Sequence, residues 1–119
     1  MDESQTVHIA GQFYRYTSCP EDGTYLFDVD GAGYRFRQWT WGEKNQVVDA
    51  STIADPANGR LRVDIARFNE LMLATSLVEA PGIGSISVAA LRRLNPVLGD
   101  TLLSMAYWVN ELPASLKKA

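Results

Sequence analysis

Hydrophobic and polar residues alternate along the first third of the chain, and this pattern predicts β-strands. Val7, Ile9 and Phe13 alternate with other residues, as expected when one face of a strand packs on a core and the other meets solvent. The expected strands cover residues 6–17, 24–29 and 34–41. The Asp- and Gly-containing segment 30–33 is typical of a tight hairpin connection. We therefore expect an antiparallel meander.

The pattern is ambiguous in the middle of the chain. Residues 46–53 fit either a strand or a helix, although two adjacent valines favour a strand because their side chains are stiff. The segment 55–59 has the Asp, Pro, Asn and Gly of a turn, and Leu61 and Val63 alternate after it. If 46–53 is a strand, this turn pairs it with the next one in a second hairpin.

Helical spacing of apolar residues replaces the alternation after residue 63. Asp64 is a good cap for a first helix that Pro81 stops, and Ser87 is a good cap for a second, short helix. Asn95 and Pro96 provide a cap and a proline at the first position of a third helix, which has a broad apolar face. This region therefore predicts about three α-helices.

These elements fit one α+β domain over residues 1–119. The expected architecture is an N-terminal antiparallel β-meander of hairpins over 6–63, followed by the C-terminal helices over 64–112 and a loose basic tail over 113–119. The chain has 119 residues, of which 46% are hydrophobic and 21% charged, a balance typical of a folded domain. Internal repeats and low-complexity segments, which would favour a divided chain, are absent from the sequence.

Composition limits the function classes. The 11 basic residues are outnumbered by 14 acidic ones, which argues against nucleic acid as the main partner because phosphate binding needs clustered Lys and Arg. Cys19 is the single cysteine, so an intrachain disulfide is excluded. The polar N-terminus and the lack of an apolar run of about 18 residues lead us to expect a soluble, cytoplasmic protein, in the host cytoplasm if the chain is viral, with no membrane contact.

Candidate chemistry is sparse, and we expect no catalytic residue, metal ligand or cofactor. A nucleophile and base formed by Cys19 and His8 across a turn is the one conceivable catalytic pair. Residues 28–31 resemble the start of a calcium loop, but Trp39 stands where the bidentate Glu is needed, so a hairpin turn is the better interpretation. The two Gly-x-Gly segments lack the other residues of a phosphate-binding loop.

Residues 34–41 form the segment with the strongest binding signal. If the strand is unbroken, Arg35, Arg37, Trp39 and Trp41 share one face, and Arg and Trp are enriched in the energetic centres of protein interfaces. We therefore name these four residues as the candidate partner-binding site. Stacking of single-stranded bases on the same face is an alternative, and a β-bulge near Arg37 that turns both tryptophans into the core is another.

Four segments together resemble small tail proteins of long-tailed phages, the nearest class being the tail assembly chaperones, including those of phage-derived contractile particles. The segments are WTWGEKN at 39–45, GRLRVDIARFN at 59–69, LVEAP at 77–81 and LNPVLGDTLL at 94–103. The resemblance covers roughly residues 36–112. The resemblance lies in the composition of these segments and in their order along the chain.

This resemblance implies a non-enzymatic cytoplasmic assembly protein, a chaperone that keeps tape-measure or tube proteins soluble through protein–protein contacts. The partners would be tape-measure, tube or baseplate proteins. The aromatic N-terminal part departs from such chaperones and leaves a minor structural tail or baseplate component open, and a small single-stranded nucleic-acid-binding regulator or a small hydrolase or transferase remain as rivals. The apolar face of the third helix would suit burial within one chain or in a homo-oligomer.

Overall fold

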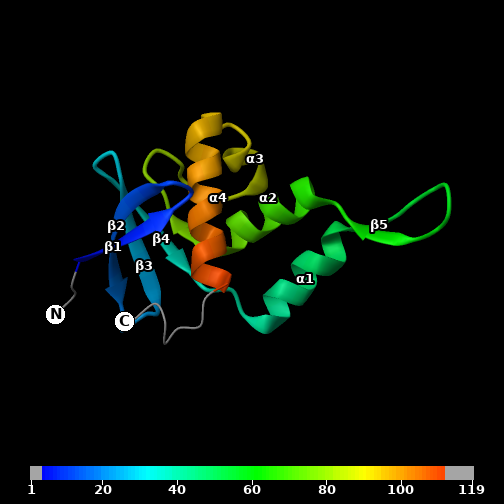
Figure 1. Ribbon diagram of the computed structural model, residues 1–119, viewed down its shortest axis with the longest axis horizontal. Coiled ribbons are helices and arrows are strands. Elements are labelled where there is room, and N and C mark those ends of the chain that lie inside the picture. Colours follow the sequence, from blue (N-terminus) through cyan, green and yellow to red (C-terminus); the bar gives the residue numbers. More distant parts are fainter. Residues whose placement is uncertain (1–3, 112–119) are drawn as a thin grey trace.

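The computed structural model describes residues 4–111, so the tail expected over 113–119 lies outside the described residues. An N-terminal antiparallel sheet is followed by C-terminal helices, as the sequence predicts, and the fold is α+β (Figure 1). The elements in chain order are β1 Ser4–Ile9, β2 Gln12–Cys19, β3 Thr24–Val29, β4 Ala32–Arg37, α1 Trp41–Ser51, β5 Thr52–Ala54, β6 Leu61–Val63, α2 Ile65–Ser76, β7 Leu77–Glu79, α3 Val88–Leu91 and α4 Pro96–Glu111.

The main sheet has five strands in the order β1-β2-β3-β4-β7. Two of its hairpins close through two-residue turns in which both residues have positive φ: Asp30 and Gly31 at 53° and 84°, and Ala10 and Gly11 at 51° and 83°. These are the values of the turn that matches the twist of antiparallel strands. The first turn was expected, whereas the second divides the predicted strand 6–17 into β1 and β2, so that prediction was wrong.

The predicted strand 34–41 was also too long, because β4 ends at Arg37 and a helix begins four residues later. Thr40 caps α1: its side chain accepts from the N–H of Glu43, and the Glu43 carboxylate accepts from the N–H of Thr40. This reciprocal pair satisfies two backbone donors that the first turn of a helix leaves open. The ambiguous segment 46–53 is therefore mostly helical, with only its end in β5.

The C-terminal helices begin where the sequence predicts. Asp64 accepts from the N–H of Arg67, and Ser87 accepts from the N–H of Ala90. Asn95 accepts from the N–H of a residue in the first turn of α4. The three predicted caps are confirmed, since each satisfies a donor that the first helical turn cannot pair internally.

The first C-terminal helix ends earlier than expected. We expected it to continue to Pro81, but α2 ends at Ser76 and the next residues form β7. β7 adds to the sheet beside β4, with a register shift between Arg35 and Phe36. Leu77 is only 3% exposed. Pairing of β7 with β4 therefore buries this apolar side chain as part of the sheet.

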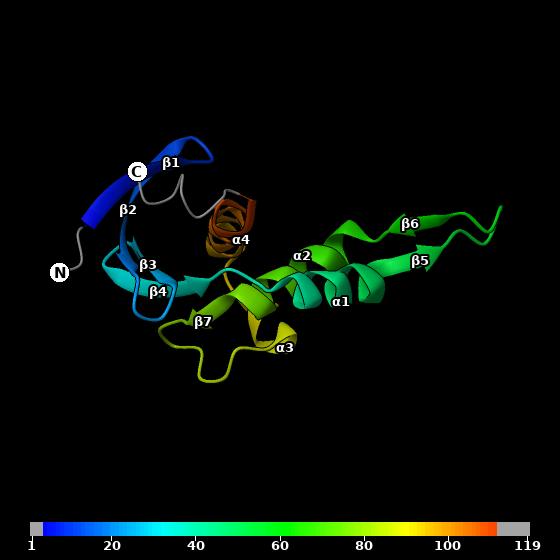
Figure 2. The ribbon, with the colours of Figure 1, turned by 90° about the horizontal axis from the view of Figure 1, so that it is seen from below.

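The core lies between one face of the sheet and the helices, and α4 runs along that face (Figure 2). The aromatic side chains of this core come from alternate residues of the sheet strands, and α4 contributes a row of fully buried side chains. Trp108 packs edge-on against Phe27 and Tyr25, with ring centroids 5.8 and 6.0 Å apart, a favoured aromatic geometry. The row on α4 consists of Leu102, Met105, Ala106 and Val109.

The molecule is elongated, with principal extents of 54 × 31 × 28 Å. Figures 1 and 2 show that α1 and α2 lie side by side and lead away from the main sheet to the two-stranded ribbon of β5 and β6. We call residues 52–65, which form this ribbon and the start of α2, the arm. Its strands pair with each other and not with the main sheet.

Candidate functional site

The four residues of the predicted Arg–Trp face do not share a face. Arg35 and Arg37 lie in β4, Trp39 follows the end of the strand, and Trp41 is the first residue of α1. The common face required an unbroken strand, and the cap at Thr40 ends it. Each of the four side chains therefore has its own surroundings.

Arg35 is held on the face of the sheet that points away from α4. Its guanidinium donates to Thr24 Oγ1 at 3.0 Å and to Cys19 Sγ at 3.4 Å, and its Nε lies 3.3 Å from Glu79 Oε1. The interaction with Cys19, chiefly its hydrogen bond, is the main cause that raises the pKa of Arg35, and the carboxylates of Glu79 and Asp22 contribute smaller increases. Arg35 thus cross-links neighbouring strands, which gives it a structural role.

Arg37 forms a bidentate ion pair with Glu43. The two nitrogen–oxygen distances are 2.8 and 2.7 Å, a geometry that is stronger than a single contact. The hydrogen bonds from Arg37, followed by the one from the backbone N–H of Thr40, lower the pKa of Glu43 to about 2. Arg37 therefore fastens the end of β4 to the first turn of α1.

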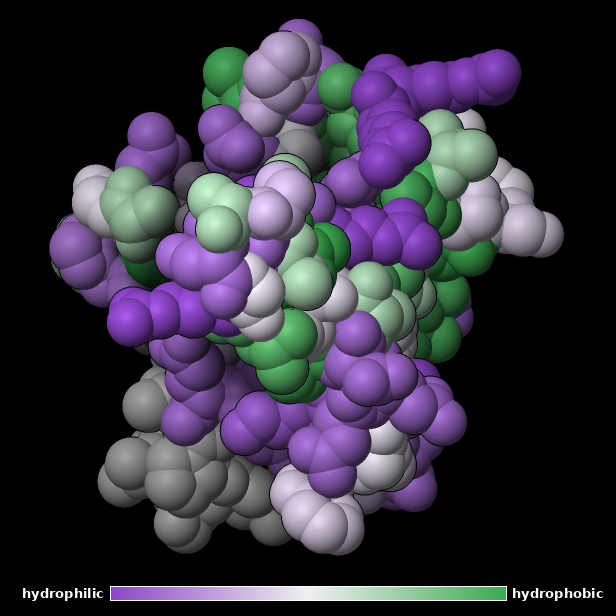
Figure 3. Space-filling model, turned by 90° about the vertical axis from the view of Figure 1, so that its right-hand side faces the viewer, coloured by the Kyte–Doolittle hydropathy of each residue, from purple (hydrophilic) through white to green (hydrophobic). Residues whose placement is uncertain are grey.

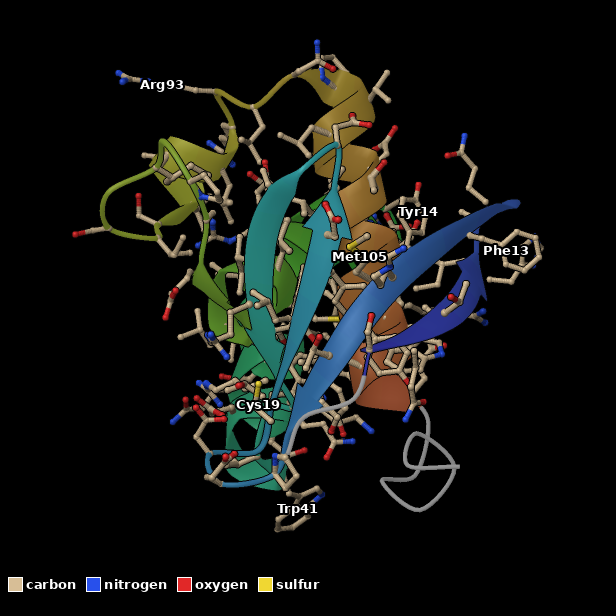
Figure 4. All side chains as sticks on the ribbon, turned by 90° about the vertical axis from the view of Figure 1, so that its left-hand side faces the viewer. Phe13, Tyr14, Cys19, Trp41, Arg93 and Met105 are labelled. Carbon is tan, nitrogen blue, oxygen red and sulfur yellow. The ribbon has the colours of Figure 1, made fainter. Side chains whose placement is uncertain are left out.

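The two tryptophans diverge, so neither sequence alternative describes both of them. Trp39 is half-buried and meets the ring of Phe68 edge-on at 5.9 Å, while its backbone N–H donates to Asn110 Oδ1 at 2.9 Å. Trp41 is 80% exposed, and Figure 4 shows it pointing away from the body of the protein. Of the four candidates, only Trp41 offers a largely exposed apolar surface.

His8 and Cys19 do not form a catalytic pair. His8 lies in β1 opposite Phe13, and the two rings are 4.7 Å apart. Cys19 lies at the other end of β2, opposite Thr24. At roughly 3.3 Å per residue, the six positions from Phe13 to Cys19 separate the two groups by about 20 Å, far beyond proton-transfer reach. Figure 4 shows Phe13 and Cys19 at opposite ends of the sheet.

The segment 28–31 is a hairpin turn. Asp28 Oδ1 accepts from the N–H of Gly31 at 2.8 Å, so this carboxylate completes the turn. Over residues 4–111, His, Cys, Asp and Glu side chains nowhere form a group of three that could hold a metal ion. The calcium-loop resemblance is thus explained by the requirements of the turn.

One cavity in the part of the chain that the structure describes has a volume of about 910 Å³. It lies between the ends of two hairpins and the start of α4, and its lining includes Arg15, Asp28 and Asp30. Neither His8 nor Cys19 contributes to it. The cavity therefore does not assemble the nucleophile and base considered from the sequence.

The arm carries exposed apolar side chains that the sequence analysis did not identify as a site. Leu61 is 74% exposed and Ile65 62% exposed, and Val63 and Ile53 are also exposed. Figure 3, which views the molecule toward the arm, shows hydrophobic patches among polar side chains. A soluble chain ordinarily buries such residues, and their grouping is typical of an interaction surface.

The register of the ribbon determines how the apolar side chains of the arm are distributed. Leu61 is opposite Ala54 and Val63 is opposite Thr52, so Leu61 and Val63 project from one face. Ile53 is opposite Arg62 and projects from the other face. The arm thus presents apolar side chains on both faces, with Arg62 and the neighbouring Arg60 exposed beside them.

Hydrogen bonds fix the arm at its base and at its tip. At the base, the N–H of Asp64 donates to the carbonyl of Ser51 at 2.7 Å, and the buried Ser51 hydroxyl donates to a carbonyl of α1. At the tip, the N–H of Asp55 donates to the carbonyl of Arg60, and that of Gly59 donates to the carbonyl of Asp55. A two-stranded ribbon is marginal on its own, so these bonds and the packed pair α1 and α2 hold it in place.

Comparisons of the chain with protein-family models, curated proteins and solved structures find no match. None of the helices within the described range 4–111 is long and apolar enough to cross a membrane. The arm groups four exposed apolar side chains, Ile53, Leu61, Val63 and Ile65, in one projecting segment.

Proposed function

We propose that this chain is a non-enzymatic, phage-type tail assembly protein that binds tape-measure or tube proteins through its arm. The supporting observation is the projecting ribbon with Leu61, Val63 and Ile65 exposed. The four segments that resemble tail assembly chaperones support the tail context, and two of them, 39–45 and 59–69, contribute residues to α1 and to the arm.

The arm is suited to reversible binding of an apolar partner segment. Full burial of one Val, Leu or Ile side chain contributes about 1.5–3 kcal/mol, so the arm offers a gross gain on the order of 5 kcal/mol. The loss of translational and rotational freedom on association offsets part of this gain. A modest net affinity fits a chaperone, because it must release its partner when the tail is built.

The charges beside the apolar side chains indicate the character of the partner. Arg62 is exposed on the face of the ribbon that carries Ile53, opposite the face of Leu61, and Arg60 is exposed just before β6. Among the described residues, neither arginine forms an ion pair. A partner segment with apolar residues flanked by Asp or Glu complements this arrangement. By contrast, Arg35 and Arg37 each bind a carboxylate, which makes the single-stranded nucleic acid alternative less favourable.

Co-expression with the tape-measure protein of the same gene cluster tests the proposal. We expect the wild-type chain to raise the soluble fraction of that protein and Leu61→Asp to abolish most of the effect. Val97→Asp is a matched control, since Val97 is also 74% exposed but lies in the first turn of α4, where an acidic residue is tolerated.

Two outcomes would contradict the proposal. In one, the wild-type chain leaves both tape-measure and tube proteins insoluble. In the other, Leu61→Asp and Val97→Asp behave alike. Recovery of the chain from purified, completed tails would instead indicate the structural tail or baseplate component that the sequence left open, because a chaperone is released before the tail is complete.

A further inference from the structure

The two edges of the main sheet differ in how they are protected. β7 is only three residues long, ends at Glu79 and is followed by Pro81. Short edge strands, charges and prolines are the devices by which proteins prevent edge-to-edge pairing. β1 is six residues long and contains no Lys, Arg, Asp, Glu or Pro. Only β7 therefore carries the usual protection.

The turn after β1 determines which backbone groups point away from the sheet. A two-residue turn is closed by a pair that exchanges two hydrogen bonds, here Ile9 and Gln12. Hydrogen-bonded pairs alternate along an antiparallel ladder. The backbone N–H and C=O groups of Ser4, Thr6 and His8 consequently point away from β2. Within the described residues, no strand pairs with β1 on that side. Figure 4 shows β1 at the edge of the sheet.

We propose that the occupant of this edge is β1 of a second copy of the chain, paired antiparallel about a twofold axis. Outward-pointing groups meet when the axis passes through Thr6 or through Val7. In both registers the residues of Ser4–Ile9 that face one another across the axis include no Lys, Arg, Asp or Glu, so the pairing brings no like charges of these strands together. Over residues 4–111 the main sheet has one such edge in each copy, so pairing through β1 closes at a dimer.

The size of the contact sets the strength of the dimer. A stable protein interface buries roughly 1,200–2,000 Å² in total, and one six-residue strand from each copy provides less than that. Backbone hydrogen bonds exchanged with water add only about 0.5–1.5 kcal/mol each. The pairing is therefore reversible and concentration-dependent, and it is separate from the binding of partners by the arm.

Sedimentation velocity over a range of concentrations tests this inference with two variants of Thr6. Thr6→Pro removes an outward N–H while leaving the ladder with β2 intact, and Thr6→Lys adds a charge beside the twofold axis in each copy. The control is Thr17→Lys, because Thr17 lies on the same face of the sheet but in the interior strand β2.

The wild type should show a monomer–dimer equilibrium that Thr17→Lys retains, and both Thr6 variants should be monomeric with unchanged circular dichroism. If Thr6→Pro fails to fold, Thr6→Lys alone decides. A wild type that stays monomeric up to high micromolar concentration, or that forms species larger than a dimer, would overturn the inference. So would dimerisation of folded Thr6→Lys with wild-type affinity, or a dimer lost in Leu61→Asp but retained in Thr6→Lys.

Discussion

Replacement of Glu43 by Gln tests the interpretation of Arg37 as a structural residue. The pKa of Glu43 falls from an ordinary 4.5 to about 2, chiefly because Arg37 donates two hydrogen bonds to its carboxylate. At about 1.36 kcal/mol per pKa unit, this difference corresponds to roughly 3 kcal/mol. The side chains of Arg37 and Glu43 are 36% and 30% exposed, so water screens the pair and we expect about 1–2 kcal/mol.

The pH dependence has a definite sign. Because the folded-state pKa of Glu43 lies below its unfolded-state value, the stabilisation is complete above about pH 5.5 and is lost as the pH falls through 4.5 toward 2. Glu43→Gln removes the charge but keeps a side chain that can accept from the backbone N–H of Thr40. Urea denaturation at several pH values, followed by circular dichroism, measures the difference in unfolding free energy between wild type and variant.

A double-mutant cycle with Arg37→Met identifies the cause of this difference. If the ion pair is responsible, Glu43→Gln should have little pH-dependent effect once Arg37 is replaced. A wild-type advantage that stays constant between about pH 7 and 3, or that is unchanged in the Arg37→Met background, would refute the reasoning. Arg37 would then be free for the partner-binding role that the sequence suggested.

Three further substitutions test the turn, the junction and the core. Ala10→Gly should raise the free energy of unfolding by about 0.5–1 kcal/mol, because Ala10 has a φ of 51° that glycine adopts without steric strain. An unfolding free energy from urea denaturation that is no higher than that of the wild type would contradict this. Asn110→Ala should lower the free energy of unfolding by about 1–3 kcal/mol, because Asn110 accepts from the N–H of Trp39 and donates to the buried hydroxyl of Ser76. An unchanged melting temperature would argue against a stabilising role of these two hydrogen bonds. Met105→Ala should lower the free energy of unfolding by about 2–5 kcal/mol, since Met105 is 0% exposed; a loss below about 1 kcal/mol would mean that the core collapses around the site.

Local signals account for the parts of the fold that the sequence predicts correctly. Asp64, Ser87 and Asn95 cap helices as expected, because capping depends on a few adjacent residues. Asp30 and Gly31 form the expected turn for the same reason. Ala10 and Gly11 form the same kind of turn without its usual Asn or Asp, so continuous alternation concealed the break between β1 and β2.

The capping box of Thr40 and Glu43 is a local helix-start signal in the sequence, but it lies at the end of an aromatic segment whose alternation favours a strand. The expected common face of Arg35, Arg37, Trp39 and Trp41 depends on an unbroken strand, whereas β4 ends at Arg37. The strand β7 is a different case, because Leu77 continues the helical spacing of α2 and joins β4 through a contact distant in sequence. Local spacing does not contain that information.

The arm was half predicted. The turn over 55–59 and the return through Leu61 and Val63 were expected, and the structure confirms a hairpin there. What the sequence pattern could not give is the exposure of Leu61 and Val63, because alternation in a strand normally marks a face that packs on a core. A ribbon that extends beyond the main sheet has no such core, and this follows only from the tertiary arrangement.

Hydrogen–deuterium exchange on a mixture with the tape-measure protein tests the binding role of the arm most directly. The exchange of the chain alone is compared with its exchange in the complex, peptide by peptide. We predict that the amides of residues 52–65 become the most strongly protected, and that Leu61→Asp removes this protection while Val97→Asp preserves it. Protection confined to other segments, or a wild-type chain whose exchange does not change, would contradict the account.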